Sequence, residues 1–359
     1  MQRGIPFFLF LFFLCSLFHV QDIAAMQLPV LKASAKKKPG VEAREAVAPV
    51  SAPSHPTSFK STASQDQTNT SSAVISLGEA HKIKAVKRRV GTPPQHKNVR
   101  LPNINKQISS KCVMVMDAVS GETIFAKSPD TPRQPASTIK VLTGSIALKM
   151  LEKREKIEVS HKASRMPSSK VYLDPKKNYL ATDLINAVLL ASANDASVAL
   201  AEKIAGNEKK FAYMMTLRAK LWGAKRTICK TASGLTAKGQ QSTARDLANI
   251  FRHAMQNPEF ASRMKKRTAV TTEGKKLYNH NKALWRVKGT QAGKTGYTAA
   301  ARQTYVGQFS RDGERIVVAI MGSETMWSDV KKLVDYGFKK KQQIRYAQAA
   351  TSPQETDVN

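Results

Sequence analysis

Patterns typical of β-strands lie at both ends of the foldable part of this chain, and helical patterns lie between them. Five segments carry the strand pattern: 112–116, 122–126, 289–297, 303–309 and 315–321. Turn residues at Ser120-Gly121 and at Arg311-Asp312-Gly313 join neighbouring strands, which predicts two hairpins. This order is typical of an α+β fold in which N- and C-terminal strands form one antiparallel sheet and a helical half is inserted.

The helical patterns predict where the two halves meet. They cover 137–152, 182–190, 194–204, 211–221 and 243–255, and a last helix over 328–340 follows the final strand. Asn194 is predicted to cap one helix and Gly206 to end it, while Ser242 is predicted to open another. A site between the sheet and the helical half would draw residues from all three regions of the chain.

The first 107 residues do not share these patterns. A basic start, an apolar run over 6–20 and small residues ending at Ala25 predict a signal peptide over 1–25, cleaved after Ala25. The run is shorter than the roughly 20 residues of a membrane span. Residues 26–107 lack sustained periodicity and apolar content, which predicts a disordered basic linker. We therefore expect the folded domain over 108–340 and a polar tail over 341–359.

The charge of the chain restricts its partners. The sequence has 58 Lys and Arg residues against 26 Asp and Glu, a net charge of +32. Nucleic acid is the usual partner of so basic a chain, but the signal peptide predicts an exported protein, periplasmic or otherwise extracytoplasmic, and so opposes it. Anionic lipid head groups and envelope polymers remain, and the basic linker could bind them weakly.

The cysteines and histidines do not indicate a metal or a cofactor. Cys15 lies in the signal peptide, which leaves Cys112 and Cys229. Export permits a disulfide between them, but two buried small side chains are the simpler interpretation. The seven histidines have no metal-ligand spacing, so we expect no metal site and no cofactor.

Ser137 and Lys140 form the first of three candidate motifs. They lie three residues apart at the start of a predicted helix, which places both side chains on one face next to free backbone N–H groups. A serine hydroxyl needs a base to act as a nucleophile, and a lysine serves if part of it is neutral. A nearby ammonium, for which Lys294 is the candidate, would lower the pKa of that lysine. Taken alone, the pair is more simply explained as a helix cap and a solvated cation.

Two later motifs supply the rest of such a site. Ser192-Ala193-Asn194 lies between predicted helices, where Ser192 could relay a proton and Asn194 could bind a peptide amide. Lys294-Thr295-Gly296 lies late in a predicted strand, where a cation and a hydroxyl suit a carboxylate and Gly296 allows close approach of a substrate backbone. Helix caps and a solvated charge would explain each motif alone. Together, in this order, they predict a serine acyl-transfer site whose general base is a lysine.

The residues around these motifs extend the pattern. Over about 109–338 the chain resembles the low-molecular-mass penicillin-binding proteins of the D-alanyl-D-alanine carboxypeptidase family, including its D,D-endopeptidase branch. The segments that carry the resemblance are Pro135-Ala136-Ser137-Thr138-Ile139-Lys140, Ser192-Ala193-Asn194-Asp195-Ala196, Ala232-Ser233-Gly234-Leu235, Ser242-Thr243-Ala244-Arg245-Asp246-Leu247, Asn279-His280-Asn281, Gly293-Lys294-Thr295-Gly296-Tyr297-Thr298 and Asp335-Tyr336-Gly337-Phe338.

The resemblance implies a β-lactamase/transpeptidase-like fold and serine hydrolysis of the D-Ala-D-Ala bond, or of D,D cross-links, in peptidoglycan stem peptides, with β-lactams as covalent inhibitors. It implies Ser137 as the acylated nucleophile, Lys140 as the base and Ser192 as the proton shuttle to the leaving amine. It also implies substrate binding by Asn194, Lys294, Thr295 and Gly296, and an oxyanion hole formed by the backbone N–H groups of Ser137 and Tyr297.

The chain departs from this family at two positions near the third motif. Arg302 stands where family members often have Gly, and Trp327 stands near a position where they often have Arg, which affects the carboxylate end of the site. We also expect no further β-sheet domain and no C-terminal amphipathic anchor, a plan similar to that of the endopeptidase branch.

Two other functions stay open from the sequence. A β-lactamase is the first, although no Glu-x-x-Leu-Asn motif lies between Ser192 and Lys294 to activate a deacylating water. A non-catalytic cationic envelope-binding protein is the second, and the presence of every catalytic side chain opposes it.

Overall fold

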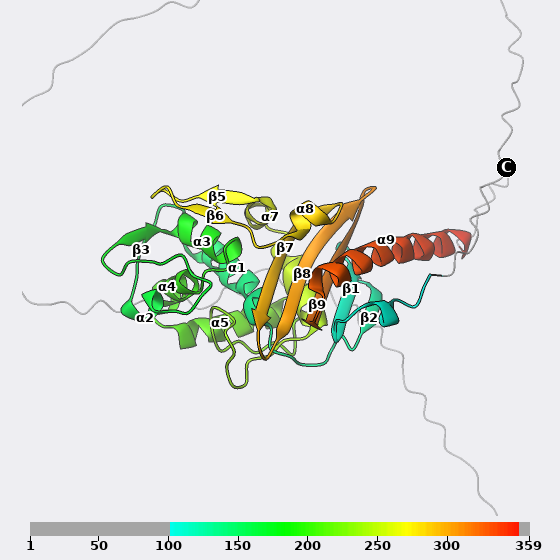
Figure 1. Ribbon diagram of the computed structural model, residues 1–359, viewed down its shortest axis with the longest axis horizontal. Helices are drawn as coiled ribbons and strands as arrows, with labels where there is room; N and C mark the ends of the chain where they lie inside the picture. The colour runs from blue at the N-terminus through cyan, green and yellow to red at the C-terminus, as the bar shows by residue number, and fades with distance from the viewer. Residues whose placement is uncertain (1–100, 352–359) are drawn as a thin grey trace, which may run out of the picture. The chain divides into compact units, whose positions relative to one another are not determined.

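The computed structural model describes residues 101–351, and a five-stranded sheet lies at its centre (Figure 1). The strands are β1 (Cys112–Asp117), β2 (Thr123–Lys127), β7 (Thr290–Thr298), β8 (Arg302–Arg311) and β9 (Glu314–Ser323). Their order is β2-β1-β9-β8-β7, and every neighbouring pair is antiparallel. The N-terminal hairpin joins the C-terminal strands in one antiparallel sheet, as the sequence predicts, and it does so by pairing β1 with the last strand, β9.

Both faces of the sheet are covered, as the alternating side chains of β9 show. Ile316, Val318 and Ile320 belong to one apolar core, and the residues between them belong to the other. The first core lies against α9 (Met326–Thr351), α8 (Ala283–Arg286) and the 3-10 helix η1 (Ile104–Gln107). The second joins the sheet to the helical half. Because neither face meets water, β9 is a continuous apolar run in the sequence.

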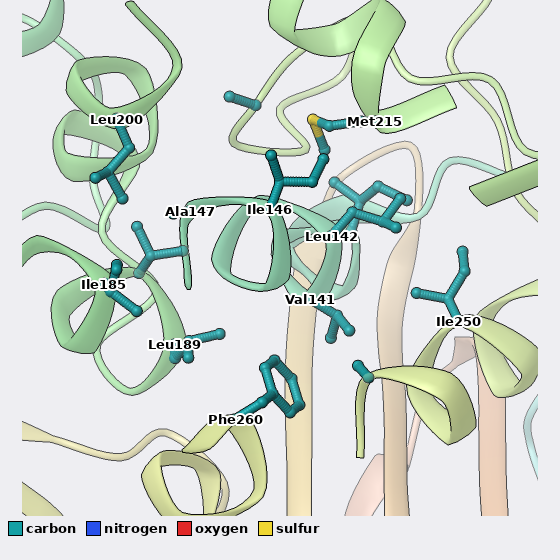
Figure 2. Close-up of a cluster of buried hydrophobic side chains, with 14 of the residues drawn as sticks. Val141, Leu142, Ile146, Ala147, Ile185, Leu189, Leu200, Met215, Ile250 and Phe260 are labelled. Atoms are coloured by element: carbon teal, nitrogen blue, oxygen red, sulfur yellow. The ribbon is translucent and has the colours of Figure 1, made fainter. Parts of the chain in front are cut away.

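Helix α1 (Lys140–Met150) is the central element of the helical half. Its buried side chains, among them Val141, Leu142 and Ile146, point to different sides and meet residues from the surrounding helices (Figure 2). Those helices are α3 (Ala181–Leu189), α4 (Asn194–Ala205), α5 (Glu208–Leu221), α6 (Ala244–Ala254) and α7 (Pro258–Lys265). A helix enclosed in this way is buried on most of its circumference.

Several short elements complete the fold, and the sequence patterns missed them. They are α2 (His161–Ser164), α7, α8, the pair β3 (Lys156–Glu158) and β4 (Asn178–Leu180), and the hairpin β5 (Thr268–Val270) and β6 (Lys276–Tyr278). Most are three or four residues long, which is too short for a period of 2 or 3.6 to be recognised.

Three local predictions were wrong. Asn194 does not cap α4, because Ala193 occupies the N-cap position and the Asn194 side chain bonds elsewhere. Thr243, not Ser242, caps α6 by accepting a hydrogen bond from the Asp246 N–H. The predicted helix over 137–152 is a 3-10 turn, η2 (Ala136–Ile139), followed by α1, so Ser137 lies on a tighter turn than expected.

The ordered elements extend beyond both predicted limits of the domain. Ile104 of η1 is buried against α9, although residues up to 107 were assigned to the linker. Helix α9 continues past Lys340, and Lys341 forms ion pairs with Asp117 and Glu314. The predicted signal peptide, most of the linker and the end of the tail lie outside the described residues. Within 101–351, no helix is both long and apolar enough to span a membrane.

Candidate active site

A cleft of about 490 Å³ lies between the helical half and strand β7. All three predicted motifs contribute to its lining, through Ser137, Ser192, Asn194, Thr295, Gly296 and Tyr297. Lys140 and Lys294 are fully buried directly beneath this lining, where they bond to its serines. The topology thus brings Ser192 and Lys294, 102 positions apart in the chain, within hydrogen-bonding distance.

Lys140 lies at the centre of the first cluster. Its Nζ is 2.9 Å from Ser137 Oγ, 2.7 Å from Asn194 Oδ1 and 2.5 Å from the backbone oxygen of Ser233. Burial, and then the positive charge of Lys294, lower the pKa of Lys140 well below its usual range. The predicted role of Lys294 as the neighbour that lowers this pKa therefore agrees with the electrostatics of the site.

Lys294 forms the second cluster with Ser192. Its Nζ lies 2.8 Å from Ser192 Oγ and 3.1 Å from the backbone oxygen of Thr295. Burial lowers the pKa of Lys294 to about 7. Ser137 and Ser192 therefore each have a lysine within hydrogen-bonding distance, and burial lowers the pKa of both lysines.

Two glycines, Gly234 and Gly296, allow neighbouring segments to pack closely against the Ser137 turn. A Cβ on Gly234, whose φ is +79°, would lie 2.0 Å from the backbone oxygen of Ala136. A Cβ on Gly296 would lie 2.8 Å from the Ser137 nitrogen. Gly296 thus permits close approach of the nucleophile turn to β7, and the N–H groups of Ser137 and Tyr297 lie on these adjacent segments.

Comparison with known proteins identifies the family. The sequence model of the S11 peptidases, described as D-alanyl-D-alanine carboxypeptidases, matches residues 96–325. The chain belongs to this family. D-alanyl-D-alanine carboxypeptidase DacB2 of Mycobacterium tuberculosis is 37% identical over 236 residues, which are 63% of this chain and 81% of the relative. DacF of Bacillus subtilis is 27% identical over 243 residues, 64% of this chain and 62% of the relative.

Solved structures agree with this assignment. A D-alanyl-D-alanine carboxypeptidase from Mycobacterium tuberculosis has a TM-score of 0.63 and 32% identity, and the match covers 71% of this chain and 95% of that one. Ampicillin-bound penicillin-binding protein D2 from Listeria monocytogenes has a TM-score of 0.59 and 28% identity, covering 64% and 98%. A mutant of the Streptomyces K15 DD-transpeptidase has a TM-score of 0.60 and 26% identity, covering 65% and 98%. The predicted family and fold class are therefore confirmed.

The cleft also contains residues that the motifs did not single out. His280 and Lys282 line it, together with Ser168 and Ser169. Desolvation, and then the charges of Lys294 and Lys140, lower the pKa of His280 to about 4, so this side chain is neutral at pH 7. A single histidine without metal-ligand spacing gives no sequence signal, and His280 stands out in the sequence only as part of the family-like segment Asn279-His280-Asn281.

The two departures from the family occupy different environments. Arg302 has a φ of +57°, a backbone conformation that favours the Gly often found there. Its guanidinium pairs with Glu324 and does not line the cleft. Trp327 does line the cleft, beside Met326, and packs edge-on against Tyr305 with the ring centroids 5.8 Å apart. Trp327 and Met326 thus form an apolar wall at this end of the cleft, beside the polar Gln303.

No group of three or more His, Cys, Asp or Glu side chains within residues 101–351 is arranged to hold a metal ion. Cys112 and Cys229 are both buried and free, which agrees with the simpler interpretation of these cysteines.

Proposed function

We propose that this protein is a serine D,D-peptidase that acts on peptidoglycan stem peptides through an acyl-enzyme on Ser137. The set of partners around Lys140 carries the proposal. A neutral lysine amine has two N–H donors and one lone pair. Asn194 Oδ1 and the Ser233 carbonyl accept the two N–H bonds, so the lone pair faces the Ser137 hydroxyl. This arrangement favours removal of the Ser137 proton.

Acylation follows from these positions. Lys140 Nζ takes the hydroxyl proton while Ser137 Oγ bonds to the carbonyl carbon of the penultimate D-Ala, and the carbonyl oxygen becomes an oxyanion. The N–H groups of Ser137 and Tyr297 would bind that oxyanion. As the C–N bond breaks, Ser192 Oγ gives its proton to the leaving amine and regains one from Lys294 Nζ, 2.8 Å away.

Deacylation uses the same groups in reverse. A water molecule takes the place of the amine and attacks the acyl carbon, and its proton returns through Ser192 to Lys294. Lys140 returns its proton to Ser137 Oγ as the ester bond breaks. Asn194 would bind the substrate amide, and Lys294, Thr295 and Gly296 would form the site for the substrate carboxylate or its equivalent.

Cleavage of D,D cross-links is the second candidate reaction, and Trp327 favours it. Family members often have an arginine near this position, whereas here Trp327 and Met326 form an apolar wall and the nearby Arg302 is paired with Glu324. Met326 and Trp327 add no positive charge to that of Lys294, so this wall itself does not favour a terminal carboxylate over an amide-linked residue. Digestion of defined monomeric and cross-linked muropeptides separates the two reactions.

We further propose that the protein is exported, with its predicted signal peptide cleaved after Ala25, and that its basic linker binds anionic envelope polymer or lipid weakly. The net charge of +32 and the family's substrate class support this location. No nucleic-acid partner is proposed.

Labelling with a fluorescent penicillin tests the proposed function. The wild-type protein should acquire one stable covalent label at Ser137, and the Ser137→Ala variant should acquire none. Among residues 101–351, no Asp or Glu lines the cleft to activate a water for rapid deacylation, so turnover of nitrocefin should be slow. Rapid, repeated hydrolysis of nitrocefin would instead support a β-lactamase, and equal labelling of both proteins would refute the role of Ser137.

A further inference from the structure

A row of cations that no carboxylate neutralises lies beside the cleft. We call it the basic ridge; it comprises Lys265, Lys266, Arg267, Lys276, Lys282, Arg286 and Lys288, from the end of α7, the β5–β6 hairpin and α8. Every one of these side chains is exposed, and among the described residues none of them forms an ion pair. Glu273, the one acid between 265 and 288, pairs instead with Lys177.

The ridge is one continuous surface. The Arg267 guanidinium lies over the Trp285 ring, 5.4 Å from its centroid, and donates a hydrogen bond to the Leu284 oxygen. The Asn279 N–H donates to the Arg267 oxygen at 2.9 Å, which joins the hairpin to the segment leading into α8. Figure 1 shows β5, β6, α7 and α8 along the same edge of the molecule. Arg267 therefore links the hairpin to α8.

The basic ridge reaches the cleft at Lys282, which belongs to the ridge and also lines the cleft. Two exposed rings, Tyr278 and Trp285, are interleaved with its cations, and Lys276 lies over the Tyr278 ring. Cations and amphipathic rings in this arrangement suit an anionic chain that also presents apolar or sugar surface. A chain bound along the ridge would enter the cleft at the Lys282 end.

We propose that the basic ridge binds the carboxylates of neighbouring stem peptides on the same peptidoglycan strand while one stem occupies the cleft. This inference rests on the proposed function, which makes a polymer of peptide stems the substrate. Each uncross-linked stem ends in a free carboxylate, so a strand presents a series of anions next to the stem that is cut. Uncompensated cations beside a cleft raise the local concentration and association rate of such a substrate by about tenfold or more.

A charge-matched pair of triple variants tests the ridge. The ridge variant is Lys266→Gln, Lys276→Gln and Arg286→Gln, which leaves Lys282 and the ring-stacked Arg267 unchanged. The control variant is Lys209→Gln, Lys210→Gln and Lys220→Gln on α5, whose exposed lysines lie outside the cleft lining. For each protein, kcat/KM is measured on a short soluble D-Ala-D-Ala peptide and on long uncross-linked strands, at low and high salt.

The ridge variant should lose about tenfold in kcat/KM on strands, with a weaker salt dependence, and keep the wild-type value on the short peptide. The control variant should match the wild type on both substrates. An equal loss on both substrates, no loss on either, or the same loss in the control variant would overturn the proposal. Equal rates of labelling by fluorescent penicillin establish that the variants are folded.

A binding assay separates this inference from the proposed function. Ser137→Ala protein, with and without the ridge substitutions, is sedimented with strands and with strands whose carboxylates have been amidated. Binding to native strands that depends on the ridge and is lost on amidation supports the proposal whether or not the enzyme cleaves. Ridge-dependent binding to anionic vesicles, with none to strands, would overturn it in favour of a membrane partner.

Discussion

The clearest test of the lysine base is to place a negative charge beside it. Asn194→Asp is nearly isosteric and puts a carboxylate oxygen at the position now 2.7 Å from Lys140 Nζ. At an effective dielectric constant of about 20, a charge pair at this separation is worth about 6 kcal/mol. That energy corresponds to about four pKa units, in the direction that keeps Lys140 protonated.

A protonated Lys140 has no lone pair for the Ser137 proton. Acylation by a fluorescent penicillin should therefore fall more than about a hundredfold at pH 7, since each pKa unit removes about nine tenths of the neutral amine. The acylation rate should recover as the pH rises, because the carboxylate raises the pKa of Lys140 but leaves the amine in place as the base. The assay is the second-order rate constant of acylation measured between pH 6 and pH 10.

Asn194→Ala is the matched control, because it removes the same hydrogen bonds to Lys140 and to the Pro167 oxygen but adds no charge. It should slow acylation without moving the pH profile upward. If Asn194→Asp and Asn194→Ala give the same pH profile, the base is not Lys140 in the environment described, and the reasoning fails.

Two further predictions concern the stability of the fold. Gly234→Ala should lower the free energy of unfolding by at least about 2 kcal/mol and abolish acylation, because the new Cβ would lie 2.0 Å from the Ala136 oxygen. Gly239→Ala is its control in urea unfolding: it shares a positive φ, but its Cβ would meet only a lysine side chain at 3.4 Å, so about 1 kcal/mol and normal acylation are expected. Asp329→Asn should cost about 2 kcal/mol, because the buried carboxylate accepts bonds from the N–H and hydroxyl groups of Ser109 and Ser110. Burial opposes the ionisation of Asp329, but these bonds hold its pKa below the usual value. The ionised carboxylate therefore adds to the free energy of unfolding above about pH 4, and this contribution is lost as the pH falls further. Acid unfolding followed by circular dichroism should show this loss in the wild type, and a variant with an unchanged acid transition would contradict it.

The sequence predicted those features of the fold and the site that depend on residue type and short spacing. β8 and β9 were recognisable because their apolar residues run long enough and a turn at Asp312-Gly313, both with positive φ, joins them. The motifs were recognisable because a nucleophile, a base and a carboxylate site need particular side chains. Both signals depend on residue type and spacing alone.

What the sequence could not supply depends on contacts between distant segments. Asn194 has the residue type of a helix cap, and only the fold places Lys140, 54 residues away, within 2.7 Å of it. The positive φ values of Ala136 and Ser192 are equally hidden, since neither residue type favours that conformation. Arg302 was expected to alter the carboxylate end of the site, but it pairs with Glu324, just after the end of β9, a contact that no spacing reveals.

Strained backbone and buried lysines occur together where the two halves of the domain meet. Ala136 and Ser192, at φ +48° and +60°, lie directly before the nucleophile and within the second motif. Such backbone costs on the order of 1–3 kcal/mol per residue and persists only where the surrounding structure fixes it. The same surroundings bury Lys140 and Lys294, and this desolvation lowers the pKa of both, which favours the neutral amine. The packing that fixes these two strained residues also keeps water from Lys140. A change that loosens this packing would relieve the strain and would also raise the pKa of Lys140 toward its usual value, so the backbone strain and the lowered pKa have one structural origin.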